Sequence, residues 1–125
     1  MKQTSIRVLD DKDLEFIEAL RSLKVPRNVA TLIAYLANAN EATSREIEVG
    51  TTLRQPEVSI AMRSLRQNNW VDDRNIKTDG KGRPTIVYKL SVPLNMIINH
   101  YEEEKTNEAT QAMMSIQRLR ELTTA

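Results

Sequence analysis

Residues 53–70 constrain the fold of this chain more than any other stretch, because they form the pattern of one amphipathic helix. Apolar side chains recur along it at the i, i+3, i+4 and i+7 positions of an α-helix, namely Val58, Ala61, Met62 and Leu65. Pro56 suits the first helical position, where its missing N–H costs no hydrogen bond. The helix should therefore bury one stripe and expose the opposite face to solvent.

The exposed face of this helix, predicted over residues 55–68, is polar and poor in acids. Its side chains are Gln55, Ser59, Arg63, Ser64, Arg66 and Gln67. Gln can pair with adenine edges, Arg with guanine and Ser with either, while an Arg that misses a base can bind a phosphate. An ordinary surface helix is the alternative, but such helices usually carry Glu and Lys in balance. The neighbouring segments help to separate these interpretations.

A short helix precedes this stretch and a tight turn joins the two. Thr43 at the N-cap and Glu46 at the third helical position match a capping box, and Gly50 is a natural helix stop. A helix over about 44–51, a turn of three or four residues and the longer helix make a helix-turn-helix arrangement. At its start, Thr43 and Ser44 can present N–H groups to a phosphate.

A β-hairpin, called the wing below, is predicted after the helix of residues 55–68. An extended segment over about 70–77 leads into a turn rich in Gly and basic residues at 78–84, and a β-branched and aromatic segment at 85–92 returns. Lys81 and Arg83 lie in the turn, where they can reach a phosphate or enter a narrow minor groove. A plain soluble hairpin is the alternative for this turn.

Further helices are predicted at both ends of the chain. A first helix covers about 11–23, and a second covers about 26–38 with Pro26 at its first helical position. A C-terminal helix can run from 94 to about 121, which is roughly 40 Å at 1.5 Å per residue. That length exceeds what a small winged domain can cover.

The C-terminal helix carries an approximate heptad seam. The seam consists of Leu94, Ile98, Tyr101, Lys105, Glu108, Ala112, Ser115 and Leu119. Its distal half needs a partner, most simply the same helix of a second copy. A solvated, frayed tail is the alternative, against which the apolar character of Met113, Met114, Ile116, Leu119 and Leu122 argues.

Charge is unevenly placed along the chain, although the net charge is only +1. Residues 54–89 contain eight Lys or Arg and four acids, which leaves +4. Residues 93–125 contain three bases and five acids, which leaves −2. A basic centre beside an acidic C-terminal segment indicates local phosphate binding, with the other end facing a different partner.

Length and composition bound the class of protein. The 125 residues, 40% of them hydrophobic, suggest one domain with a modest core. The lack of cysteine excludes disulfides and thiolate zinc sites, and it fits a reducing compartment. Residues 1–9 lack the apolar core of a signal peptide, and no apolar run approaches the ~20 residues that span a bilayer. We expect a soluble, cytoplasmic protein that does not enter a membrane.

No set of reactive side chains indicates an enzyme. His100 is the sole histidine and has no second His or Cys for a metal site, while Ser59 and Ser64 have no His partner at a telling spacing. We therefore expect no enzymatic activity, no metal and no cofactor. Trp70 and Tyr88 could stack on a base, but we expect them to be core residues.

Several segments carry a resemblance to a known family. They are Thr43-Ser-Arg-Glu-Ile, Arg54-Gln-Pro-Glu-Val-Ser-Ile-Ala-Met-Arg-Ser-Leu, Asn69-Trp-Val and Lys81-Gly-Arg-Pro-Thr-Ile-Val-Tyr-Lys-Leu. Over about residues 26–91 the chain resembles winged helix-turn-helix regulators of the MarR and TrmB type, in particular small predicted regulators common in archaea. The most specific part is the Val-Ser-x-Ala-x-x-x-Leu helix combined with a Gly-Arg-Pro wing.

The resemblance implies a dimeric transcription factor on double-stranded DNA. One recognition helix per subunit would enter successive major grooves, and the wings would lie on flanking backbone or minor groove. The implied contacts are base reading by Gln55, Ser59 and Arg63, phosphate binding by Arg54 and Arg66, and a wing contact by Arg83. The 125 residues do not include a segment that resembles the large effector domain of sugar-sensing TrmB proteins, and no residues identify a phenolic ligand pocket. A small-molecule effector is therefore neither predicted nor excluded.

Together these observations predict a mainly α fold with a small β-hairpin. Residues 1–92 would form a winged helix-turn-helix DNA-binding domain, and residues 93–125 a C-terminal dimerisation helix. The alternative function is a winged-helix module that binds protein and has no DNA affinity. DNA binding requires Arg54, Arg63, Lys81 and Arg83 to share one face, repeated across the dimer at ~34 Å. The operator, the regulated genes, the direction of regulation and the dominant dimer helix are not predicted.

Overall fold

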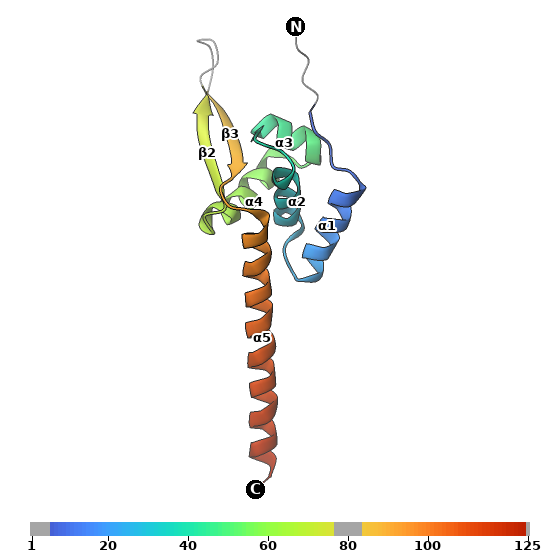
Figure 1. Ribbon diagram of the computed structural model, residues 1–125, viewed down its shortest axis with the longest axis vertical. Coiled ribbons are helices and arrows are strands. Elements are labelled where there is room, and N and C mark those ends of the chain that lie inside the picture. Colours follow the sequence, from blue (N-terminus) through green and yellow to red (C-terminus); the bar gives the residue numbers. More distant parts are fainter. Residues whose placement is uncertain (1–5, 77–83, 125) are drawn as a thin grey trace. The chain divides into compact units, whose positions relative to one another are not determined.

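The computed structural model describes residues 6–76 and 84–124 (Figure 1). The elements are α1 (Asp11–Ser22), α2 (Arg27–Ala37), β1 (Ala42–Thr43), α3 (Ser44–Thr51), α4 (Gln55–Gln67), β2 (Val71–Ile76), β3 (Thr85–Leu90) and α5 (Leu94–Thr123). They divide into two units, residues 1–92 and 93–125. The fold is mainly helical with a small antiparallel sheet, as predicted.

Helix α2 lies at the centre of the first unit, where it packs against α1, α3 and α4 (Figure 1). All of its residues from Val29 to Leu36 are buried, and the two alanines among them, Ala30 and Ala34, permit close helix packing. The helix begins one residue later than predicted, because Pro26 is its N-cap rather than its first helical residue. The apolar core of the first unit is therefore built around one short helix.

Helix α3 begins at the predicted capping box. The Thr43 hydroxyl oxygen accepts the N–H of Glu46 at 3.1 Å, and Glu46 Oε1 accepts the N–H of Thr43 at 2.8 Å. The predicted span of about 44–51 is confirmed, but Gly50 lies inside the helix and does not end it, since the left-handed residue is Thr52, with a φ of 60°. Gly50 must have another role.

Gly50 is a packing position. A Cβ built on it would lie 2.5 Å from Cε1 and 2.8 Å from the hydroxyl oxygen of Tyr35, and it would overlap the carbonyl oxygen of Arg7. The backbone of residues 7–9 runs past α3 here, and the N–H of Leu9 donates to the carbonyl of Gly50 at 3.4 Å. Absence of a side chain thus lets the N-terminal segment approach α3.

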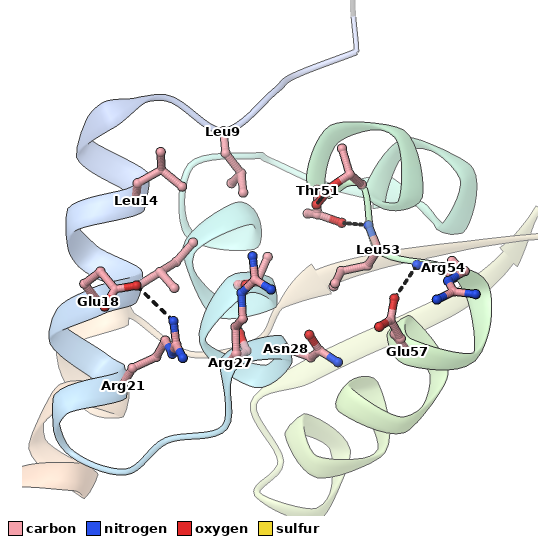
Figure 2. A pocket seen from close by; sticks show the side chains of 13 residues that line it. Leu9, Leu14, Glu18, Arg21, Arg27, Asn28, Thr51, Leu53, Arg54 and Glu57 are labelled. Carbon is pink, nitrogen blue, oxygen red and sulfur yellow. Dashed lines mark hydrogen bonds and ion pairs between the residues drawn. The ribbon is translucent and has the colours of Figure 1, made fainter.

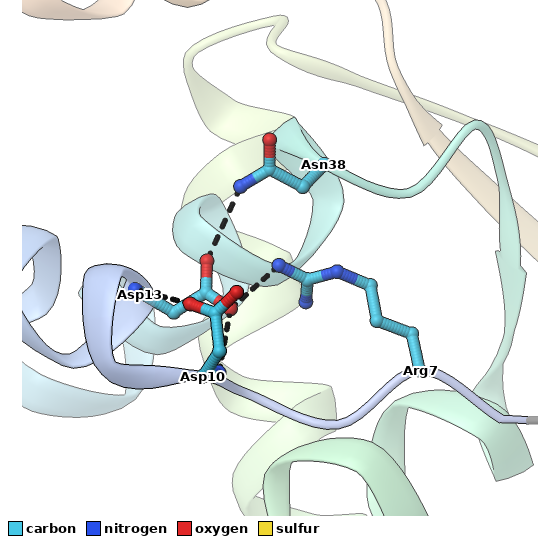
Figure 3. A network of polar contacts seen from close by, with 4 residues as sticks. All are labelled: Arg7, Asp10, Asp13 and Asn38. Atoms are coloured by element: carbon cyan, nitrogen blue, oxygen red, sulfur yellow. Dashed lines mark hydrogen bonds and ion pairs between the residues drawn. The ribbon is translucent and has the colours of Figure 1, made fainter.

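A polar network holds the same N-terminal segment to α1 and α2 (Figure 3). Asp13 is 3% exposed, and its carboxylate accepts hydrogen bonds from Arg7 at 2.6 Å, from the backbone N–H of Asp10 at 2.9 Å and from Asn38 at 3.2 Å. The Arg7 guanidinium also lies over the Tyr35 ring, 5.0 Å from its centroid. The network connects residues that are distant in the sequence.

The sheet contains the predicted hairpin and one further strand. β3 pairs with β2 in antiparallel register from Val71 opposite Leu90 to Ile76 opposite Thr85. The short strand β1 pairs with the other side of β3, so the strand order is β1-β3-β2. This third strand was not predicted.

Aromatic residues at the base of the hairpin belong to the core. Trp70 and Tyr88 are both 6% exposed, which confirms the expectation that they are core residues. Ala42 in β1 lies opposite Tyr88 and is also buried. Trp70, immediately before β2, and Tyr88, within β3, therefore anchor the hairpin to the core.

Helix α5 is the only element of the second unit that the described residues contain, and its 30 residues extend slightly beyond the predicted end. Five large apolar side chains in its distal third are 42–64% exposed: Met113, Met114, Ile116, Leu119 and Leu122. No helix in residues 6–76 or 84–124 combines the length and apolar character that crossing a membrane requires.

Candidate nucleic-acid interface

Helix α4 presents the polar face that the sequence predicted. Its buried residues are Val58, Ala61, Met62 and Leu65, which are the four residues of the predicted stripe. Gln55, Ser59 and Arg63 recur at intervals of four residues and are all exposed. None of these three side chains has a hydrogen bond or ion pair with another described residue, so all three are available to an external partner.

The N-terminal end of α4 is arranged differently from the prediction in one detail. Arg54 is the N-cap and Gln55 the first helical residue, so Pro56 occupies the second position. The backbone N–H of Arg54 donates to Glu57 Oε1 at 2.8 Å, which occupies a backbone donor at this end. The Arg54 side chain is exposed and has no ion pair with a described residue.

A pocket of about 460 Å³ lies beside this end of α4, between α1, α2 and the turn that joins α3 to α4 (Figure 2). Arg21, Arg27 and Arg54 are among its lining residues. Arg21 is paired with Glu18 at 3.0 Å, whereas Arg27 has no ion pair among the described residues. Arg27 thus lines the same pocket as Arg54 and also has no ion pair with a described residue. It was not predicted because the two arginines are far apart in the chain.

Arg66 lies on α4 but is already engaged within the protein. Its guanidinium pairs with Asp73 of β2 at 2.9 Å and lies 5.8 Å from the centroid of the Tyr88 ring. Ion pairs this exposed are worth about 0–1 kcal/mol, so a phosphate could replace Asp73 at small cost. Arg66 nevertheless differs from Arg63, which has no ion pair with any residue in the described ranges.

The start of α3 contributes backbone donors and one further cation. Because the capping box occupies the N–H groups of Thr43 and Glu46, the first-turn N–H groups of Ser44 and Arg45 are left without a capping side chain. The Arg45 side chain is exposed and has no ion pair with a described residue. Thr43 and Ser44 were predicted contacts here and Arg45 was not, although Arg45 follows the predicted capping residue by two positions and therefore falls in the first turn of the helix.

The turn of the wing carries two predicted contacts, Lys81 and Arg83, which lie outside the described residues. On the described part of the hairpin, Arg74 is paired with Glu41 at 2.6 Å, while Lys89 is exposed. The structure therefore brings together the contacts predicted on α3 and α4 within one helix-turn-helix, and it does not address those on the wing turn.

Histidine and acidic side chains form no metal cluster within residues 6–76 and 84–124, where no group of three or more could hold an ion. His100 makes an edge-to-face contact with Tyr101, with ring centroids 5.2 Å apart.

Comparison with known proteins finds similarity in structure only. No protein-family model matches the chain, and no curated protein matches it in sequence. A solved structure described as a possible transcriptional regulator from Methanosarcina mazei Go1 matches with a TM-score of 0.63 and 14% identity, over 91% of this chain and 98% of its own. A second transcriptional regulator matches with a TM-score of 0.50 and 18% identity, over 89% of this chain and 72% of its own.

At these identities the similarity concerns the fold alone, which both matched regulators share with this chain over nearly its full length. In this chain the fold contains the capped helix α3, the turn into α4 and the hairpin that follows. The expectation from sequence is therefore confirmed for the fold, and this chain is a winged helix-turn-helix protein.

Proposed function

We propose that this chain is a sequence-specific, DNA-binding transcriptional regulator that acts as a homodimer. The observation that carries the proposal is the outer face of α4, where Gln55, Ser59 and Arg63 are exposed and have no side-chain hydrogen bond or ion pair with a described residue. Exposed hydrogen-bonding side chains on the second helix of a helix-turn-helix are suited to the edges of base pairs in the major groove. The matched structures described as transcriptional regulators support this assignment.

Phosphate contacts would surround this base-reading face. Arg54, Arg45 and Arg27 supply guanidinium groups that have no ion pair with a described residue. The start of α3 supplies the backbone N–H groups of Ser44 and Arg45, whereas the N–H of Thr43 is already bonded to Glu46. Arg66 would contribute after exchanging Asp73 for a phosphate. On the wing, the assignment of Lys81 and Arg83 to DNA rests on the sequence.

Dimerisation would use α5. Its distal apolar side chains recur at intervals of three and four residues, as in Ala112, Ile116, Leu119 and Leu122, and the large ones are exposed in the single chain. Burying a leucine side chain stabilises by about 1.5–3 kcal/mol, so pairing two copies of this helix would provide a substantial driving force. Such a dimer would explain why a helix of 30 residues exposes so many apolar side chains in the single chain.

The first experiment is a titration of random duplex DNA by fluorescence anisotropy across a salt series. If the protein neutralises several phosphates, log Kd should rise linearly and steeply with log salt concentration. Failure to bind random DNA even at low salt would contradict the proposal and favour the alternative of a protein-binding module. Selection of preferred duplexes from a random pool then supplies a specific ligand.

Arg63→Ala should weaken binding to the selected duplex by about 5- to 100-fold, because a bidentate Arg contact to guanine is worth ~1–3 kcal/mol. The loss of affinity for random DNA should be much smaller. Arg21→Ala is the matched control, since it removes the same charge from α1, where Arg21 is paired with Glu18. Equal losses on selected and random DNA would show that Arg63 binds phosphate and does not read a base.

Leu119→Glu in the full chain should weaken the dimer at least about 100-fold, because each copy loses a buried leucine and places a charge in an apolar interface. Sedimentation velocity across a protein concentration series measures the change. Gln117→Glu is the control, because it adds the same charge to an exposed position two residues away. A monomer–dimer equilibrium that Leu119→Glu leaves unchanged would exclude this part of α5 from the interface.

A further inference from the structure

Ile60 is an apolar residue on the outer face of α4 that the contacts proposed above leave unused. Its side chain is 65% exposed, which is the largest exposed fraction among the large apolar side chains of the described residues. Scattered exposed apolar residues are common and need no explanation by themselves. The position of Ile60, however, places it within the surface that is proposed to face base pairs.

Helical geometry puts Ile60 near the middle of the exposed face of α4, beside Arg63. At ~100° per residue, Ile60 lies about 150° around the helix from the centre of the buried stripe. It follows Pro56 by four residues and precedes Arg63 by three, so these side chains are neighbours on one face. If Arg63 reads a base in the major groove, Ile60 would lie beside it and face the edge of a base pair.

In the major groove, thymine is the only base whose edge carries an apolar group. The C5-methyl group of thymine projects into the major groove, whereas the other base edges present hydrogen-bond donors and acceptors. Against those polar edges, an isoleucine would remove water without replacing its hydrogen bonds, which is unfavourable. Against a thymine methyl, it would bury apolar surface on both molecules.

We propose that Ile60 is a specificity-determining residue that selects thymine through contact with its C5-methyl group. This inference rests on the proposed function and adds to it a base that α4 prefers. Residues three apart on a helix have Cβ atoms about 5–6 Å apart, and successive base pairs are ~3.4 Å apart. The selected thymine should therefore lie within one or two base pairs of the base read by Arg63.

The test replaces each thymine of the selected duplex in turn by deoxyuridine, which lacks only the C5-methyl group. For the wild-type protein, one or two positions per half-site should show a loss of affinity of about 3- to 10-fold, as expected for burial of a methyl group. Ile60→Ala should weaken binding to the thymine duplex by a similar factor. With this variant, the same deoxyuridine substitutions should have no further effect, because the methyl group then has no partner.

Two controls separate this result from effects on folding. Ile60→Ala removes an exposed side chain and has a higher helix propensity than isoleucine, so the variant should fold. Val49→Ala removes an exposed apolar side chain from α3 and should leave the sensitivity to deoxyuridine unchanged.

The outcomes distinguish the inference from the proposed function. Equal sensitivity to deoxyuridine in wild type and Ile60→Ala would overturn the inference, as would a selected duplex that tolerates deoxyuridine at every position. In both cases salt-dependent binding to random DNA would leave the proposed function standing. Absence of any DNA binding at low salt would overturn both.

Discussion

Gly50→Val is expected to lower the free energy of unfolding by about 3 kcal/mol or more, because the new side chain has no space. Its Cβ alone would overlap the carbonyl oxygen of Arg7 and lie 2.5 Å from Cε1 of Tyr35, which is buried. The N-terminal segment would have to move away from α3, and the hydrogen bond from Leu9 to Gly50 would be lost. Valine at this position should therefore destabilise the packing of α3 as well as the N-terminal segment.

Chemical denaturation followed by Trp70 fluorescence measures this effect, because Trp70 is buried and is the only tryptophan in the chain. Arg45→Val is the control, since it places the same β-branched side chain at an exposed position of α3. The control should change stability by no more than about 0.5 kcal/mol. If Gly50→Val changed stability as little as the control, the close packing around Gly50 would be contradicted.

Asp13→Ala should lower the free energy of unfolding by about 2–4 kcal/mol, because it leaves Arg7 without its carboxylate partner in a partly buried site. The Asn38 side chain and the Asp10 backbone N–H also lose their acceptor. Asp11→Ala removes an exposed acid from the same helix end and should cost about 0.3–1 kcal/mol. Equal losses of stability for Asp13→Ala and Asp11→Ala would show that Asp13 stabilises the protein only as an acid at the helix N-terminus, and not through its hydrogen-bond network.

The same carboxylate makes stability depend on pH. Burial alone would raise the pKa of Asp13, but the hydrogen bond from the Asp10 backbone and the contacts with Arg7 and Asn38 lower it below its ordinary value of 3.8. Since the folded-state pKa lies below the unfolded one, the stabilisation is fully present above about pH 4–5 and is lost as pH falls through the folded-state value. Below pH 4 the stability of wild type should approach that of Asp13→Ala.

Local sequence patterns were sufficient to predict the helices. The spacing of apolar residues in α4 and the capping box of Thr43 and Glu46 depend on neighbours within one or two turns. Strand β1 escaped prediction because two residues have no periodicity, and its pairing with β3 joins Ala42 to Tyr88 across the intervening helices. The role of Gly50 was misjudged for a similar reason, since the atoms that require a glycine there belong to Arg7 and Tyr35.

For the candidate interface too, features set by neighbours in the sequence were predicted, and contacts between distant residues were not. Composition and helical spacing predicted that Arg63 would be exposed on the polar face, but they could not show that Arg66 is paired with Asp73, because that contact forms only when β2 packs beside α4. Ile60 was missed because an apolar residue on a polar face carries no signal until its exposure is measured. Arg27 required the pocket that brings α2 beside the start of α4.

The strand order of the small sheet affects how the protein resists aggregation. Both β1 and β2 are edge strands, because β3 lies between them. Unpaired edges invite other chains to add strands, and proteins oppose this with very short strands or with charges. β1 has only two residues, and β2 carries the consecutive exposed charges of Asp72, Asp73 and Arg74. Strand addition at the sheet is thereby disfavoured, and even concentrated solutions should resist conversion to fibrils that grow from these edges.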